Sequence, residues 1–149
     1  MRKWLTVLAV VAISAGTFAA EGWLTDFDKA KALAKEQDRH ILIDFSGSDW
    51  CGWCIKLDKE VFQKQEFKDY AKENLVLLLV DWPQRSVDSK EVQAKSRPIM
   101  EQYGIQSFPT VLVLGPDGKT LAKTGYRDGG PEAYVEHIKK IIVDGKEKK

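Results

Sequence analysis

The sequence predicts an α/β fold in which one mixed β-sheet carries helices on both faces. Three observations predict it. The 149 residues suit a single domain of ordinary size. Helix-like and apolar strand-like segments follow one another in the order α–β–α–β–α–β–β–α. A helix between two apolar strands implies a parallel crossover, whereas a short turn between the last two strands implies an antiparallel pair, so we expect both kinds of pairing.

The first residues have the layout of a secretory signal peptide. Arg2 and Lys3 form a charged start, residues 5–15 are almost all apolar, and small residues follow. This apolar run is shorter than the ~20 residues that a membrane span needs. An uncleaved N-terminal anchor is the alternative.

Small side chains indicate where the signal peptide ends. Cleavage after Ala19 places small residues at positions −3 and −1, whereas cleavage after Ala20, the alternative, places bulky Phe18 at −3. We therefore expect a signal peptide over 1–19 and a single domain over 20–149. Export moves the domain to a periplasmic or other extracytoplasmic compartment, where disulfides form and persist.

The charge balance argues against a nucleic-acid partner. The chain has 23 Lys and Arg residues against 22 Asp and Glu residues, and loss of Arg2 and Lys3 leaves 21 against 22. Such a balance gives no positive field that attracts a polyanion. Hydrophobic residues make up 44% of the chain, which argues against intrinsic disorder.

The domain begins with a helix and a strand. Residues 25–38 carry apolar side chains at helical spacing, and Thr25 or Asp26 provides the cap. Residues 41–45 form an apolar run rich in strand-forming side chains, with one acid, Asp44, inside it.

Two helical pieces, a second strand and an insertion follow. A helix is expected over 51–62 and another near 65–73, and the nearly continuous apolar run over 75–82 suits a strand covered on both faces. Residues 84–102 are polar with scattered apolar side chains. They predict a helical insertion in which Pro98 opens the last helical portion.

The chain ends with a hairpin and a helix. Two strands are expected over 110–114 and 119–126, joined by the turn sequence GPDG. An amphipathic helix over 131–144, with proline in its first turn, closes the domain. We expect the tail, residues 145–149, to be frayed.

The sequence Cys51-Gly52-Trp53-Cys54 follows a strand and a loop and opens a helix. A helix N-terminus offers unpaired N–H groups and a partial positive charge, which stabilise a thiolate at the first cysteine. Cys54 lies on the same helical face, one turn deeper, where it can attack the sulfur of Cys51. We therefore assign Cys51 as the nucleophile and Cys54 as the resolving thiol.

Two other uses of the cysteines stay open at this point. The pair has the spacing of half a zinc site, but His40 and His137 lie far apart in the sequence and have no companion ligands. A purely structural disulfide would close a very small loop, so its entropic stabilisation would be small. We expect no metal and no cofactor beyond the Cys51–Cys54 disulfide.

Three stretches resemble segments of the thioredoxin superfamily, and they follow one another in the same order as in that family. They are ILIDFSGSDWCGWC, YGIQSFPTVLVL and TGYRDGGPEAYVEHI, and the likeness spans roughly residues 24–143. It implies a thioredoxin fold with a helical insertion before the cis-proline loop. It also implies an enzyme, a thiol:disulfide oxidoreductase that cycles between dithiol and disulfide. The loop and the insertion are similar to those of the exported DsbH-like and DsbD C-terminal-domain-like groups.

The resemblance also implies roles for residues around the cysteines. Pro109 matches the cis-proline that faces the disulfide, and Phe108 matches the residue whose backbone pairs with an extended client chain. Trp50 matches the tryptophan that precedes the cysteine pair. We expect Trp50, Gly52 and Trp53 to contact the client as well, and shielding of the disulfide is the alternative role for Trp53.

Asp44 resembles the buried strand acid that exchanges a proton with the resolving cysteine. Burial of a carboxylate raises its pKa, as a proton carrier near neutral pH requires. An acid that points to solvent is the alternative, because the loop before Cys51 holds one residue more than in typical thioredoxins. The lysine that usually neighbours this acid is replaced by leucine, at Leu77 or nearby.

The direction of electron flow is expected to be reducing. Reduction potentials run from about −270 mV for thioredoxin to about −120 mV for the oxidant DsbA, which stabilises its reduced form strongly. The intervening Gly52 and Trp53 bring no cation to Cys51. We expect a monomeric reductase of exported disulfide-containing proteins, supplied by a membrane thiol-shuttling donor of the DsbD kind. A disulfide isomerase, an oxidase and a thioredoxin-fold peptide-binding module without turnover are the alternatives.

Overall fold

The computed structural model describes residues 22–148. The expected signal peptide over 1–19 and its cleavage site lie outside these residues. A five-stranded sheet forms the centre, in the order β1-β3-β2-β4-β5. The strands are β1 Trp23–Leu24, β2 His40–Ser46, β3 Leu75–Asp81, β4 Thr110–Leu114 and β5 Thr120–Thr124. The helices are α1 Phe27–Gln37, α2 Gly52–Leu57, the π-helical turn η1 Asp58–Phe62, α3 Gln65–Asn74, α4 Ser89–Tyr103 and α5 Gly130–Glu147.

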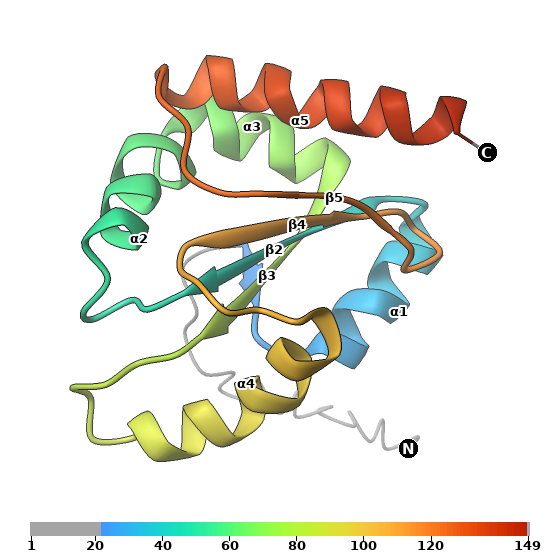
Figure 1. Cartoon of the computed structure of the whole chain (residues 1–149). Coiled ribbons are helices and arrows are strands. Elements are labelled where there is room, and N and C mark those ends of the chain that lie inside the picture. The colour runs from blue at the N-terminus through green and yellow to red at the C-terminus, as the bar shows by residue number, and fades with distance from the viewer. Residues whose placement is uncertain (1–21, 149) are drawn as a thin grey trace, which may run out of the picture.

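The sheet is mixed, as the sequence predicts. Strand β3 pairs in parallel with β1 and β2, whereas β4 pairs antiparallel with β2 and β5. Helices α2, α3 and α5 cover one face, and α1 and α4 cover the other (Figure 1). The predicted α/β fold, a mixed sheet with helices on both faces and a helical segment before β4, is therefore confirmed.

The alternation of β2 sorts its side chains between two cores. Ile41, Ile43 and Phe45 pack with α1 and α4, whereas Leu42 packs with α2, α3 and α5. Because successive strand residues point to opposite faces, Asp44 shares the face of Leu42. It therefore lies in the layer that α2 and α5 cover.

Local signals mark the ends of two helices, and the first of them, Asp26, is one of the two predicted caps of α1. The Asp26 side chain caps α1 by accepting a hydrogen bond from the Lys29 N–H at 2.9 Å. Gly104 ends α4 with a left-handed backbone, φ +60°, which glycine adopts without steric cost.

Several details differ from the sequence predictions. The short edge strand β1 is additional, and α5 continues to Glu147 through the tail expected to fray. The prediction that Pro98 opens a helical portion is wrong, because Pro98 lies inside the continuous helix α4. Its ring faces solvent, so the helix accommodates it at the cost of one backbone hydrogen bond.

No helix within residues 22–148 combines the length and the apolar character that crossing a bilayer requires.

Candidate active site

The loop between β2 and α2 delivers the cysteine pair to one end of the sheet. Cys51 is the N-cap residue of α2, and its Sγ accepts a hydrogen bond from the Cys54 N–H at 3.2 Å. The two cysteines form a disulfide with Cα atoms 5.3 Å apart. A thiolate at Cys51 would lie at the positive end of the helix and face this N–H, which favours the ionised sulfur.

The two sulfurs differ in their surroundings. Cys51 is 7% exposed and Cys54 is 3% exposed. The Cys54 Sγ accepts a hydrogen bond from the Gly47 N–H at 3.5 Å, which ties it to the loop behind α2. Gly52 is exposed and the Trp53 side chain is 57% exposed, so the surface next to the disulfide is open to a partner.

The Phe108–Pro109 segment lies at the same end of the sheet as the cysteines. The peptide bond between these residues is cis, and β4 begins directly after it. Thr110 pairs with Phe45 near the end of β2, from which the chain enters the cysteine loop. The Phe108 ring packs edge-to-face on Trp50, with ring centroids 5.7 Å apart. The structure thus brings Trp50, Phe108 and Pro109 to one edge beside the disulfide.

Asp44 is buried beneath this edge. It is 6% exposed and its Oδ1 has no hydrogen-bond partner, so the alternative of a solvent-facing acid is wrong. Burial raises its pKa to about 8, and the carboxylates of Asp58 and Asp81 add to the rise. Leu79 of β3 pairs with Asp44, so the strand residue next to this acid is a leucine, as expected. Leu77, two residues earlier in β3, pairs with Leu42.

Tyr134 of α5 lies near Asp44 on the same face of the sheet. Its hydroxyl donates a hydrogen bond to the Gly125 carbonyl at 3.0 Å. Burial raises the pKa of Tyr134, and the negative charge of Asp44 adds to the rise. The tyrosine therefore stays protonated and joins α5 to the loop after β5.

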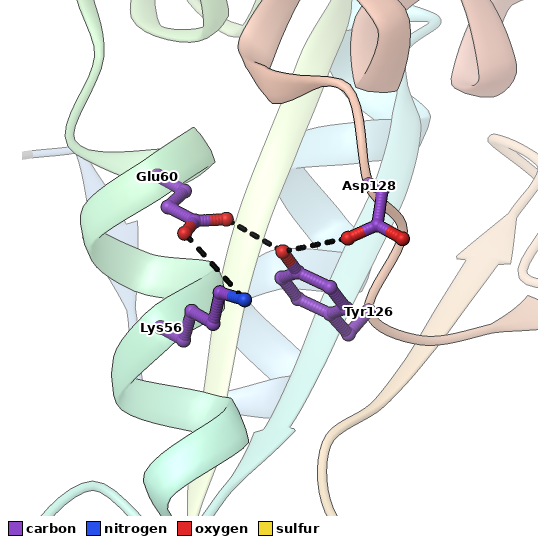
Figure 2. Close-up of polar contacts among 4 residues, drawn as sticks. All are labelled: Lys56, Glu60, Tyr126 and Asp128. Carbon is purple, nitrogen blue, oxygen red and sulfur yellow. Dashed lines mark hydrogen bonds and ion pairs between the residues drawn. The ribbon is translucent and has the colours of Figure 1, made fainter.

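The sequence did not reveal a polar cluster that is formed by Lys56, Glu60, Tyr126 and Asp128 (Figure 2). This cluster adjoins Trp53. The Trp53 ring packs on Tyr126 at 5.0 Å, and the Lys56 ammonium lies 4.9 Å and 5.0 Å from the two ring centroids. The Tyr126 hydroxyl donates to Glu60 at 2.6 Å and lies 3.2 Å from an Asp128 oxygen. The Lys56 ammonium lies 3.8 Å from Glu60. These contacts join α2 and η1 to the segment after β5 and fix one side of Trp53.

Within residues 22–148, no group of three His, Cys, Asp or Glu side chains is placed to hold a metal ion. The zinc alternative therefore finds no ligand set in the part of the chain that is described. His137 instead lies with its Nε2 3.0 Å from the Thr124 hydroxyl.

Comparisons with known proteins agree with this geometry. A family model described as a thioredoxin-like domain matches residues 27–141. Disulfide bond reductase DsbH of Chlamydia pneumoniae is 36% identical over 115 residues, which cover 76% of this chain and 69% of the relative. Thiol:disulfide interchange protein DsbD 2 of Pseudomonas aeruginosa is 28% identical, over 75% of this chain and 19% of the relative.

Solved structures show the same fold. A DsbH oxidoreductase superposes with a TM-score of 0.73 at 31% identity, over 93% of this chain and 94% of the other. The oxidised C-terminal domain of DsbD from Neisseria meningitidis has a TM-score of 0.56 at 19% identity, over 76% and 90% of the two chains. The second likeness concerns the fold alone.

Proposed function

The chain belongs to the thioredoxin-like family and is a thiol:disulfide oxidoreductase of the Dsb and thioredoxin type, and from this premise we propose that it reduces disulfides of client proteins outside the cytoplasm. The observation that carries the proposal is the Cys51–Cys54 disulfide at the start of α2, at the same end of the sheet as the cis peptide bond Phe108–Pro109. This arrangement supports a cysteine pair that cycles between a dithiol and a disulfide.

The proposed reaction moves two electrons from the protein to the client. The Cys51 thiolate attacks one sulfur of the client disulfide, forms a mixed disulfide and releases the other client sulfur as a thiolate. Asp44 takes the proton of the Cys54 thiol, and the resulting thiolate attacks Cys51. The Cys51–Cys54 disulfide forms, and the second client thiolate leaves and is protonated.

Client binding is proposed along the exposed edge around the disulfide. The backbone of Phe108, next to Pro109, would pair with an extended client segment as an added strand. Trp50, Gly52 and Trp53 would contact the client on the cysteine side. The exposure of Trp53, in contact with Tyr126, supports this assignment.

The reducing direction is proposed from the groups near Cys51. Gly52 and Trp53 supply no positive charge between the cysteines, so the thiolate lacks the strong stabilisation of an oxidant. The name of the Chlamydia relative, a disulfide bond reductase, points the same way. We therefore place the reduction potential nearer to about −270 mV than to about −120 mV.

The location and the electron supply complete the proposal. Residues 1–19 would act as a cleaved signal peptide, so that the mature domain covers 20–149. A reductase outside the cytoplasm needs electrons carried across the membrane, and a membrane thiol-shuttling protein of the DsbD kind would supply them. The clients would be exported proteins with accessible disulfides.

Trapping of the mixed disulfide tests this function. A Cys54→Ser variant keeps the nucleophile but cannot release the client. Exported proteins should therefore accumulate on Cys51 as mixed disulfides that dithiothreitol reduces. A Cys51→Ser variant is the matched control and should trap none. Absence of adducts from Cys54→Ser would favour the peptide-binding module.

Measurement of the reduction potential decides between the reductase and its redox alternatives. Equilibration of the wild type with glutathione or dithiothreitol should give a value near that of thioredoxin. A value near that of DsbA would make the protein an oxidase. A dimer that reshuffles wrongly paired disulfides would make it an isomerase.

A further inference from the structure

A carboxylate next to the active site holds the segment that follows β3. The Asp49 side chain accepts hydrogen bonds from three successive backbone N–H groups, those of Gln84 at 2.9 Å, Arg85 at 2.7 Å and Ser86 at 3.0 Å. Such consecutive N–H groups form a concave site for an anion. They hold the pKa of Asp49 below its usual range, the Gln84 N–H foremost, so this carboxylate is ionised at neutral pH.

Further contacts join the same two segments. The Ser48 N–H and hydroxyl donate to the Asp81 carboxylate at 3.0 Å and 2.5 Å. The Trp82 N–H donates to the Ser46 carbonyl at 2.7 Å. Loop 46–50 and segment 81–86 therefore behave as one unit beside the disulfide.

Helix α4 anchors the far side of this unit. The Ser96 hydroxyl donates to the Asp81 carbonyl at 2.6 Å, and the Gln93 side chain donates to the Pro83 carbonyl. The Arg97 guanidinium lies 5.0 Å from the Trp82 ring centroid. The insertion before β4 thus supports segment 81–86, and this segment holds the active-site loop.

Trp50 connects segment 81–86 to the expected client-binding edge at Phe108. Its indole N–H donates to the Trp82 carbonyl at 2.7 Å, and its ring packs on Phe108 at 5.7 Å. The ring also covers Gly47 so closely that a Cβ there would lie 2.5 Å from it. The indole of Trp50 is therefore held by three contacts, with the Trp82 carbonyl, Gly47 and the Phe108 ring.

We propose that Asp49 is a positioning residue for client binding. By holding residues 84–86, it keeps Trp50 against Phe108, so that the Phe108 backbone is already placed to pair with an extended client chain. The inference rests on the proposed function. Asp49 does not touch the reacting sulfurs, so it acts on the binding of a polypeptide and not on the exchange of sulfurs. An edge that is already ordered before the client arrives lowers the entropy that is lost on binding.

An Asp49→Asn variant tests the inference with two substrates of different size. The asparagine side chain has the same shape as that of aspartate, but its NH2 group stands where one carboxylate oxygen accepts a backbone N–H. The hydrogen bonds that hold residues 84–86 are therefore weakened. Insulin serves as the polypeptide disulfide, with dithiothreitol as the electron source. Dithiobis(nitrobenzoate) serves as the small disulfide and is reduced in a single turnover by protein that has been reduced beforehand and freed of dithiothreitol, because dithiothreitol itself would reduce this compound. We expect the KM for insulin to rise at least threefold with kcat within twofold, and the second-order rate constant for dithiobis(nitrobenzoate) to stay within twofold.

An Asp117→Asn variant is the matched control. Its carboxylate also accepts a backbone N–H, that of Lys119 at 3.1 Å, in the turn after Leu114 at the opposite end of the sheet. It should leave both substrates unchanged. Equal losses for both substrates in Asp49→Asn, or an unchanged KM for insulin, would overturn the inference alone. A wild type that reduces neither substrate would overturn the proposed function, and this inference with it.

Discussion

Asp44 combines deep burial with two nearby like charges, and each of these three effects raises its pKa. The carboxylates of Asp58 and Asp81 repel its ionised form, and its partner in the neighbouring strand is the uncharged Leu79. With a pKa of about 8 the acid holds its proton at neutral pH. Its ability to accept the proton of Cys54 therefore increases as the pH rises toward 8.

The first prediction concerns the rate of client release. In the wild type the attack of Cys54 on a preformed mixed disulfide should speed up as pH rises through about 8, because Asp44 ionises there. An Asp44→Asn variant should be slower by about tenfold or more at pH 8 and lose this inflection. Stopped-flow measurement of the released thiol from pH 6 to 9 checks it.

Asp58→Asn is the accompanying control. Removal of one negative neighbour lowers the pKa of Asp44, so the inflection should move to lower pH while the rate above it is retained. An inflection that stays in place in both variants would assign it to another group.

The sequence predicted single residues where the local pattern itself carried the chemistry. The cysteine pair at a helix start was enough to predict a redox-active disulfide. The burial of Asp44 was implied by the resemblance, whereas the local pattern left a solvent-facing acid as the alternative. Asp49 and Tyr126 were missed, because their partners lie 35 and more positions away and no local pattern indicates which segments meet.

At the scale of elements, most helices and strands follow from their apolar spacing, and the exceptions have physical causes. The two residues of β1 are too few to show a period, and they become a strand only by pairing with Leu77 and Leu78. The π-helical turn Asp58–Phe62 was not predicted, because its apolar side chains fit an ordinary helix as well. Pro98 has the same sequence signature whether it opens a helix or interrupts one.

The second prediction concerns Pro98 within α4. An alanine there would restore a backbone N–H for the Ala94 carbonyl and relieve the clash of the ring with that turn. Pro98→Ala should raise the free energy of unfolding by about 1 kcal/mol. The gain is smaller than the full cost of a proline within a helix, because the proline also restricts the unfolded chain and its removal gives up that benefit. Urea unfolding measures it. Lys95→Ala, an exposed neighbour in the same helix, should change stability little, and a loss of stability in Pro98→Ala would contradict the prediction.

At the scale of the whole molecule, the fold places the carboxyl group of Asp44 in a layer of mainly aliphatic and aromatic side chains. The core under α2, α3 and α5 is built from aliphatic and aromatic side chains, and Asp44 lies on the face of the sheet that this core covers. The protein is therefore less stable than an equally packed apolar core would make it. Such a cost is common where a group is retained for its chemistry.

The third prediction concerns stability against pH. The unfolded chain releases the Asp44 proton near pH 4, whereas the folded protein keeps it until about pH 8, so the free energy of unfolding falls between these values and levels off above them. Asp44→Asn removes this fall and should be more stable at pH 7 by about 2 kcal/mol, after the cost of burying an amide. Urea unfolding at pH 5 and pH 8 should show the larger gain at pH 8. An equal gain at both would contradict a raised pKa.

Helix α5 starts near α2 and runs across the sheet to the opposite end of the molecule (Figure 1). A linker joined to the end of α5 would thus point away from Cys51. The protein tethered to a resin through this end would present its sulfurs outward, and even bulky folded polypeptides would reach them without hindrance from the support.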